Sequence, residues 1–226
     1  MRSKISTFFS ITTFLIALAL FASMTEASSS KGNSSSSSSS EWPVIEIQTD
    51  TMPKINDRVE ITDYNRNDWI HWSDLDHDCQ TSRAEILIKQ SVNPKEIVYT
   101  DAYKKCAVRS GKWIDPYSGK TYTDASKLDI DHIVPLKWAH EHGAASWSKA
   151  QKKLFANDLN NLNAVYYSLN RSKIDKGPTE WMPPEQKYRC TYINSFNNIV
   201  ISYKLTYTTS EYRIIKRMLS ACNNIK

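Results

Sequence analysis

At residues 129–136 the chain reads Asp129-Ile130-Asp131-His132-Ile133-Val134-Pro135-Leu136, with a carboxylate and an imidazole side by side before an apolar run that a proline stops. Adjacent residues of a strand point to opposite sides, so Asp131 and His132 can serve one site only if the strand ends or bends there. Pro135 cannot extend a central strand, which makes such an ending expected. We therefore place the chemistry of this protein at this stretch.

A second polar cluster follows at residues 160–173. It begins with Asn160-Asn161-Leu162-Asn163 and ends with Asn170-Arg171-Ser172-Lys173. Hydrolysis of a phosphodiester with a divalent ion requires a base for the attacking water, hard oxygen ligands for the ion, and cations that offset the charge of the transition state. The two clusters together contain all three, with His132 as the base because its ordinary pKa lies near working pH.

The order and spacing of these residues resemble the HNH nuclease motif, a ββα-metal unit that is also seen in the HNH domain of CRISPR effector nucleases. Further motifs extend along the chain, at Tyr64-x-Arg66-x-Asp68-Trp69, Asp78-Cys79-Gln80-x-x-Arg83-Ala84-Glu85, Gly111-x-Trp113-x-Asp115-Pro116-Tyr117-x-Gly119 and Glu180-Trp181-x-Pro183-Pro184. Together they resemble secreted HNH proteins related to the C-terminal domain of the GmrSD restriction endonucleases. The resemblance covers roughly residues 55–205 and implies an α+β fold. In that fold a ββα-metal (HNH) core carries an additional N-terminal hairpin and helix and C-terminal helices.

The resemblance also implies a role for each matching residue. His132 is the expected general base, and Asp131 and Asn170 are the expected metal ligands. Asn161 is expected to hold the hairpin loop and to orient the histidine through the backbone, and Asp129 is given a supporting role. Since an asparagine stands where the motif name has its last histidine, the expected ion is Mg²⁺, with Mn²⁺ as the second choice, rather than zinc.

Two cations are expected to contact the phosphate. The resemblance places Lys173, also a catalytic residue, and Arg171 near the first turn of the motif helix, where the helix dipole favours an anion. Asn170-Arg171-Ser172 is at the same time an N-glycosylation sequon. A glycan on Asn170 would abolish coordination, so either the sequon is skipped or the site is inactive, and the intact mass of the secreted protein decides between them.

The start of the chain has the pattern of a secretory signal peptide at residues 1–27. Arg2 and Lys4 form the basic region, Phe8 to Phe21 the apolar region, and Thr25-Glu26-Ala27 the cleavage site. The apolar region is shorter than the about 20 residues that span a bilayer, and no later segment reaches that length. We expect a secreted, extracellular protein without a membrane span.

Residues 28–41, dominated by Ser34 to Ser40 and with a sequon at Asn33, predict a disordered leader. Residues 42–226 contain regularly spaced aromatic and branched residues, which predicts one domain with a hydrophobic core, and the resemblance implies that it is an HNH-type nuclease domain. The four cysteines, Cys79, Cys106, Cys190 and Cys222, form no C-x-x-C pair, so two disulfides are expected outside the cell. Three pairings are allowed, and we favour Cys79–Cys106 with Cys190–Cys222 because each ties neighbouring elements.

Local patterns predict several elements besides the motif. Residues 59–61 predict an extended run, Ser82 with Glu85 a capping box before a helix over 83–91, and residues 113–122 a hairpin that turns at 115–119. Helices are expected at 136–142 and at 148–156, where Leu154 and Phe155 are expected on one side, and a strand at 162–166. Two amphipathic helices follow, one with Tyr192 and Phe196 and one capped by Thr208 and Glu211.

An acidic stretch has the oxygen spacing of an EF-hand calcium loop, with Asp74, Asp76, Asp78 and Glu85 at the ligand positions. Cys79 stands where that loop requires glycine, and Glu85 is already explained as a capping residue. We therefore interpret the stretch as an acidic surface loop, with structural calcium as the alternative.

These patterns predict a secreted, metal-dependent endonuclease that cleaves nucleic acid, DNA rather than RNA, with low sequence specificity and as a monomer. The formal net charge of +5 is compatible with a polyanionic partner but does not establish one. Two alternatives stay open: a non-catalytic secreted protein that binds a polyanion or a partner, and a secreted ribonuclease-type effector.

Overall fold

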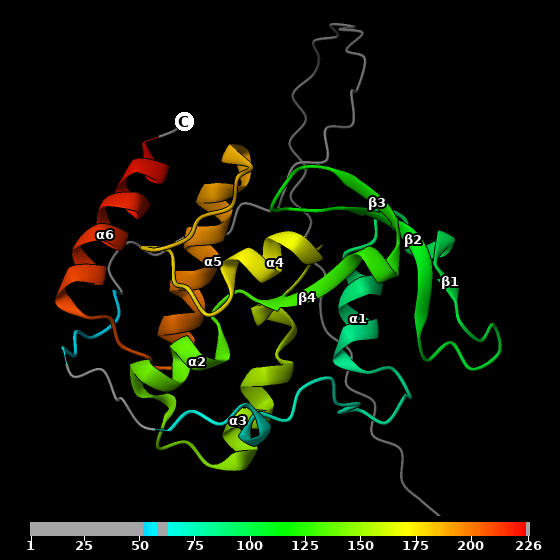
Figure 1. The fold of residues 1–226 in the computed structure, drawn as a ribbon, viewed down its shortest axis with the longest axis horizontal. Helices are drawn as coiled ribbons and strands as arrows, with labels where there is room; N and C mark the ends of the chain where they lie inside the picture. The colour runs from blue at the N-terminus through cyan, green and yellow to red at the C-terminus, as the bar shows by residue number, and fades with distance from the viewer. Residues whose placement is uncertain (1–51, 58–62, 225–226) are drawn as a thin grey trace, which may run out of the picture. The chain divides into compact units, whose positions relative to one another are not determined.

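The computed structural model describes residues 52–57 and 63–224, which form a mixed α+β fold of six α-helices and two small sheets (Figure 1). The expected signal peptide (1–27), the serine-rich leader (28–41) and the extended run at 59–61 lie outside the described residues. Among the described residues, no helix is long and apolar enough to cross a membrane.

The first sheet contains the predicted hairpin. Strand β2 (Val108–Ile114) pairs antiparallel with β3 (Thr121–Asp124), and the turn closes when Gly119, at a φ of 69°, donates its N–H to the carbonyl of Asp115. A two-residue strand that was not predicted, β1 (Val98–Tyr99), extends the sheet on the far side of β2.

Helix α1 (Ser82–Lys89) packs beside this sheet. Its buried residues Ile86 and Leu87 join Trp113 in a hydrophobic cluster, and the Trp113 indole donates to the Leu87 carbonyl at 2.7 Å. The helix is where the sequence predicts it, but the capping box is wrong: Thr81 is the N-cap, and the Ser82 hydroxyl donates to Asn157. A buried hydroxyl needs a partner, and Asn157 supplies it from a distant part of the chain.

The second sheet is the centre of the molecule. Strand β4 (Leu128–His132) pairs antiparallel with β5 (Leu162–Tyr166), with Asp131 opposite Asn163 and His132 opposite Leu162. Helix α4 (Tyr167–Lys173) follows β5 directly and packs against both strands (Figure 1). The expected strand at 162–166 is confirmed, and residues 128–132 and 162–173 form a strand–strand–helix unit.

Helices fill the connection between β4 and β5. Strand β4 ends at His132, and Pro135 is the N-cap of α2 (Leu136–Ala139). Helix α2 continues as a π-helical turn (His140–Ala144) that Gly143 breaks at a φ of 117°. Helix α3 (Lys149–Asn157) carries the predicted Ser148 cap. The prediction that Leu154 and Phe155 share a side is wrong, because consecutive helical residues are about 100° apart: Phe155 is buried and Leu154 is 58 % exposed.

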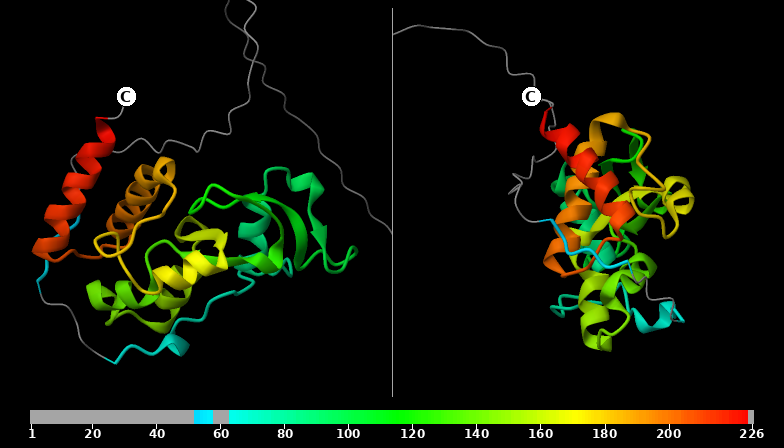
Figure 2. Two further views of the ribbon diagram at one scale, coloured as in Figure 1. Left: turned by 45° about the horizontal axis from the view of Figure 1, so that its top comes forward. Right: turned by 90° about the vertical axis from the view of Figure 1, so that its left-hand side faces the viewer.

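The larger hydrophobic core is formed in part by residues of α2, α3 and the two C-terminal helices. Helix α5 (Arg189–Ser202) buries Tyr192 and Phe196, and α6 (Thr209–Asn223) has the predicted Thr208–Glu211 capping box. The first described residues pair with this region, since Ile55 bridges Tyr207 and Asp57 accepts from both Thr209 N–H and Thr209 O–H. Figure 2 shows them, in cyan, beside the start of α6.

Both predicted disulfides are confirmed. Cys79–Cys106 joins the loop before α1 to the loop between β1 and β2, and Cys190–Cys222 joins α5 to α6. Each bridge connects neighbouring elements, as the sequence predicts.

Candidate functional site

The middle of the site is a buried ion pair between β4 and α4. The Lys173 ammonium lies 2.9 and 2.8 Å from the two carboxylate oxygens of Asp131 and 2.7 Å from the carbonyl oxygen of His132. The Tyr117 hydroxyl, from the β2–β3 turn, donates to the same carboxylate. Burial raises the pKa of Asp131 and lowers that of Lys173, and each charge opposes this effect on the other.

Lys173 does not lie where a phosphate could reach it. Its side chain is 0 % exposed, and three oxygens accept its three protons. The expectation that Lys173 contacts the phosphate is therefore corrected. In this structure its buried ammonium neutralises the Asp131 carboxylate inside the protein. Arg171, whose side chain is 69 % exposed, is the cation that faces solvent.

His132 is buried and fixed from two sides. Its Nε2 lies 2.9 Å from the carbonyl oxygen of Ala156, and the Trp72 ring stacks on the imidazole with ring centres 5.6 Å apart. Trp72 has a φ of 58°, a left-handed conformation that bulky residues rarely adopt. A carbonyl only accepts, so Nε2 carries the proton and Nδ1 keeps the lone pair when the ring is neutral.

The electrostatics keep that ring neutral. Burial, helped by the nearby charge of Arg66 and opposed by the hydrogen bond to Ala156, lowers the pKa of His132 to about 3. At neutral pH the imidazole is thus a free base rather than a cation.

Asn161 holds the turn that follows His132. Its Oδ1 accepts the N–H of Val134 at 2.8 Å, its Nδ2 donates to the Val134 carbonyl at 3.2 Å, and its own carbonyl accepts from Ile133. These are the contacts expected of the residue that holds the hairpin loop, and they fix the backbone next to the imidazole.

The Asn170 side chain hydrogen-bonds to Asp129. The Asn170 amide donates to Asp129 Oδ2 at 3.3 Å, and Arg171 Nε lies 3.6 Å from the same oxygen. Asp129, given only a supporting role by the sequence, is therefore the carboxylate that joins the two α4 residues.

A pocket of about 450 Å³ opens over these groups. Its walls include four of the seven expected site residues: Asp131, His132, Asn170 and Arg171. The remaining lining residues come from the N-terminal loop, from β4 and α2, and from the end of α4: Tyr64, Arg66, Ile130, Pro135, Leu136, Lys137, Ile174 and Asp175. Asp129, Asn161 and Lys173 are not among the residues that line this cavity.

Other contributors to this site were not predicted. They come from parts of the chain far from β4 and α4. Tyr117 donates to Asp131, Trp72 stacks on His132, and the charge of Arg66 lowers the pKa of His132. Tyr117 and Arg66 do stand in the wider motifs, which was the available signal. Lys137 pairs with Asp175 at 2.7 Å on the pocket wall.

The donors of the pocket suit a hard divalent cation. The Asp131 carboxylate and the Asn170 side-chain amide offer oxygen ligands that Mg²⁺ or Mn²⁺ accepts, and Mg²⁺ needs few protein ligands because it keeps several waters. Zinc sites prefer several thiolates or imidazoles, whereas the lining residues of the pocket include one imidazole, that of His132, and no thiolate. The residues present therefore fit the expected ion in chemistry.

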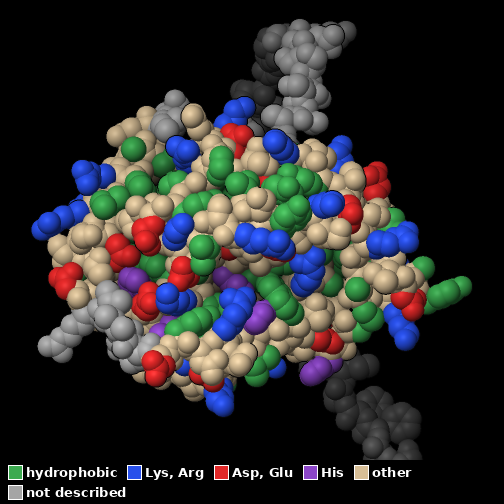
Figure 3. All heavy atoms as spheres, in the orientation of Figure 1, with side chains coloured by type: hydrophobic (Ala, Val, Ile, Leu, Met, Phe, Trp, Pro, Cys, Tyr) green, Lys and Arg blue, Asp and Glu red, His purple; other side chains and the backbone are tan. Residues whose placement is uncertain are grey.

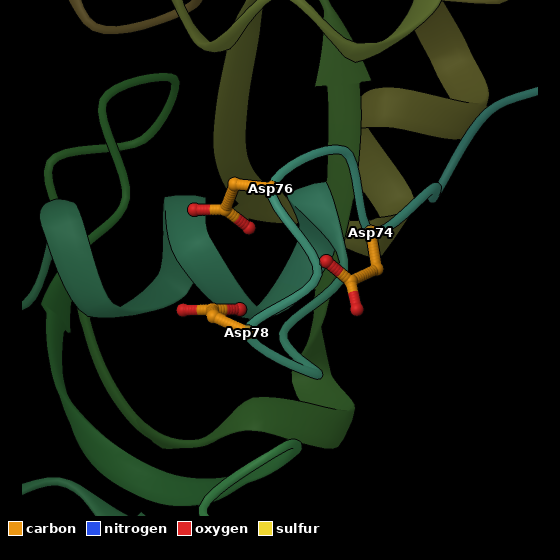
Figure 4. A group of neighbouring side chains, drawn as sticks. All are labelled: Asp74, Asp76 and Asp78. Atoms are coloured by element: carbon orange, nitrogen blue, oxygen red, sulfur yellow. The ribbon is translucent and has the colours of Figure 1, made fainter. Parts of the chain in front are cut away.

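A second acidic group lies away from this pocket. Ligand atoms of Asp74, Asp76 and Asp78 lie within 4.8 Å of one another in the loop before α1 (Figure 4). Asp74 accepts the N–H groups of His77 and Cys79, and Cys79 adopts a φ of 75° although it is not glycine. Burial and these carboxylates raise the pKa of Glu85. Exposed acidic groups are common, and the interpretation as an acidic surface loop stays a prediction.

Comparison with known proteins agrees with the resemblance seen in the sequence. The family model for the C-terminal domain of GmrSD restriction endonucleases matches residues 81–218. An uncharacterized secreted protein of Arthroderma benhamiae is 41 % identical over 161 residues, which cover 70 % of this chain and 76 % of that protein. No solved structure matches the chain. The secreted relative and the two disulfides confirm the predicted extracellular location.

Proposed function

The chain belongs to the family of GmrSD restriction endonuclease C-terminal domains, which indicates a nuclease-like protein, and we propose that it is a secreted, metal-dependent endonuclease. In this proposal β4, β5 and α4 are an HNH ββα-metal core. The observation that carries it is the setting of His132, a neutral base fixed through Nε2 in the same pocket as Asn170 and Arg171.

His132 takes the proton from the attacking water. Nδ1 holds the free lone pair, and the Nε2–H bond to Ala156 keeps the ring in place and stabilises the imidazolium that forms. Trp72 restricts rotation of the ring, and Asn161 fixes the backbone that carries it. A neutral imidazole at neutral pH is the state that such a base requires.

Asp131 and Asn170 are the proposed ligands of a divalent ion, Mg²⁺ or Mn²⁺, with Asp129 beside Asn170 as the supporting carboxylate. When bound, the ion supplies electrostatic stabilisation of the charge on the phosphate and on the leaving oxygen. Lys173 keeps Asp131 ionised inside the protein, and Arg171 offers its guanidinium to the phosphate at the pocket rim.

The proposed substrate is nucleic acid, DNA before RNA, cleaved with low sequence specificity by a monomer. Lysine and arginine side chains are spread across the face that carries α2 and α4, with acidic side chains among them (Figure 3). Such a mixed surface attracts a phosphate backbone without reading bases.

Cleavage of supercoiled plasmid tests the proposal. The wild-type protein is expected to nick plasmid with Mg²⁺ or Mn²⁺ and to stop in EDTA, and His132→Ala is expected to lose about 10²- to 10⁴-fold in rate. His77→Ala changes an exposed histidine outside the pocket and serves as the matched control. Equal rates for wild type and His132→Ala, or full activity in EDTA, would show that the mechanism is wrong.

One observation favours a second candidate, a non-catalytic secreted protein that binds a polyanion. Both oxygens of Asp131 already accept from Lys173, so the expected ligand is engaged by an internal cation. Polyanion binding that is independent of metal, with no cleavage of DNA or RNA in any metal tested, would favour this candidate. Parallel digestion of DNA and RNA also identifies a ribonuclease.

A further inference from the structure

Three tyrosines form a continuous strip where β3 meets the junction of β5 and α4. Tyr122 of β3 stacks on Tyr166 of β5 with ring centres 5.0 Å apart and planes 12° apart, and the ring of Tyr167, the first residue of α4, follows at 4.7 Å. All three rings are half-buried, so each keeps part of its surface in solvent. We call Tyr122, Tyr166 and Tyr167 the tyrosine strip.

The strip ends at the catalytic pocket. The Arg171 guanidinium lies 4.8 Å from the centre of the Tyr167 ring, and the same residue lines the pocket with Asn170. A strand whose phosphate contacts Arg171 therefore has its neighbouring nucleotide within reach of the tyrosines.

A groove of about 370 Å³ lies along the strip. Tyr122, Tyr166, Leu169 and Pro184 make its walls apolar and aromatic, and the groove also includes Ser118, Lys120 and Glu185. The Glu185 carboxylate accepts the N–H of Lys187 at the start of a short helix, which occupies one of its oxygens. The volume is at the small end of the range for small-molecule sites, about 300–1,000 Å³.

This combination fits an unpaired nucleobase. Stacking on aromatic side chains holds a base whatever its identity, while Lys120 and Arg171 suit the phosphates on either side. A base in a duplex is stacked and paired, and it must leave the helix before it can enter such a groove. We propose that the tyrosine strip holds a base next to the scissile phosphate, so that the preferred substrate is single-stranded nucleic acid. This inference rests on the proposed nuclease function.

Binding rather than cleavage tests the strip. Fluorescence anisotropy compares labelled oligo(dT), an abasic strand of the same length and charge, and a duplex, using the full chain with His132→Ala in EDTA. We expect oligo(dT) to bind about tenfold more tightly than the abasic strand, because the abasic strand keeps the phosphates but has nothing to stack. Duplex binding is expected to resemble that of the abasic strand.

Variants localise the effect. Tyr122→Leu and Tyr166→Leu are expected to abolish the preference for bases, and Tyr122→Phe to keep it, because phenylalanine retains the ring. Tyr103→Leu is the control, since Tyr103 is 98 % exposed in the loop between β1 and β2. Thermal melting of each variant verifies that it is folded, and Tyr122→Phe separates loss of the aromatic ring from loss of the hydroxyl.

The outcomes separate the two proposals. The proposal that the tyrosine strip binds a base is wrong if oligo(dT) and the abasic strand bind with equal affinity. It is also wrong if folded Tyr122→Leu and Tyr166→Leu keep the preference for oligo(dT). Both conclusions hold even if the wild-type protein cleaves plasmid. A preference that depends on the tyrosines supports the strip, and it does so even if no nucleic acid is cleaved, which would overturn the nuclease function alone.

Discussion

Lys173 donates to both carboxylate oxygens of Asp131, at 2.9 and 2.8 Å, although the two residues lie 42 positions apart in the chain. The side chains are 0 % and 5 % exposed, so water screens neither charge. A buried charge without its partner is strongly unfavourable, so this pair joins α4 to β4 as one unit.

Lys173→Met is therefore expected to lower the free energy of unfolding by about 3–5 kcal/mol, because it leaves the Asp131 carboxylate buried and unpaired. Urea denaturation at neutral pH measures the change. Lys127→Met, at an exposed lysine, is the control and is expected to have little effect. Adding Asp131→Asn to Lys173→Met should recover part of the loss; a double variant no more stable than Lys173→Met would contradict the pairing.

Tyr117→Phe removes the hydroxyl that donates to Asp131. The expected loss is about 1–3 kcal/mol of unfolding free energy, since the carboxylate is buried and loses one of its donors. Tyr103→Phe, at an exposed tyrosine, should leave the stability unchanged. A loss at Tyr117 no larger than at Tyr103 would mean that the hydroxyl does not stabilise the carboxylate.

The burial of His132 predicts how stability depends on acid. Its pKa is lowered to about 3 in the folded protein against 6.5 for the free side chain, so between these values the unfolded chain binds the proton more readily. The stability that the neutral ring contributes is complete above pH 6.5 and is lost as pH falls toward 3.

Urea denaturation of the wild type and of His132→Gln, at about pH 7 and about pH 4.5, isolates this effect from other titrating groups. The advantage of the wild type should shrink in acid, because glutamine does not titrate. The same difference between the two proteins at both pH values would show that His132 titrates normally.

Ile174 ends α4 with a φ of 57° and a ψ of −117°, a conformation that a β-branched residue adopts only under strain. Its side chain is 65 % exposed, so little burial is lost on truncation. Ile174→Gly is expected to raise the unfolding free energy by about 1 kcal/mol. Calorimetry compares it with Leu154→Gly, at an exposed residue inside α3, which should lose about as much. A fall in stability at Ile174 would mean that the backbone is not strained.

The elements that the sequence predicts correctly have signals within a few residues of one another. The turn at 115–119, the Ser148 and Thr208 caps and the aromatic spacing of α5 each depend on local geometry. The pairing of the cysteines was also predictable, because each bridge joins neighbouring elements.

Where the structure differs from the sequence-based predictions, the cause is a contact between distant parts of the chain. Ser82 looks like a cap in its local context, yet its hydroxyl is taken by Asn157, 75 positions away. Lys173 looks like a phosphate ligand on a helix, yet the packing of α4 on β4 buries it against Asp131. No local pattern reports which face of a seven-residue helix will be covered.

The pairing of residues 55–57 with residues 207–209 can form only late in synthesis of the chain. The ribosome makes Ile55 long before Tyr207, so this closure and the Cys190–Cys222 bridge both wait until α6 has been translated. During that interval Asn170 has already been translated, but the contacts between residues 55–57 and 207–209 have not yet formed. In a compartment that attaches N-glycans, the sequon at Asn170 is thus exposed to the transferase before folding shelters its amide against Asp129.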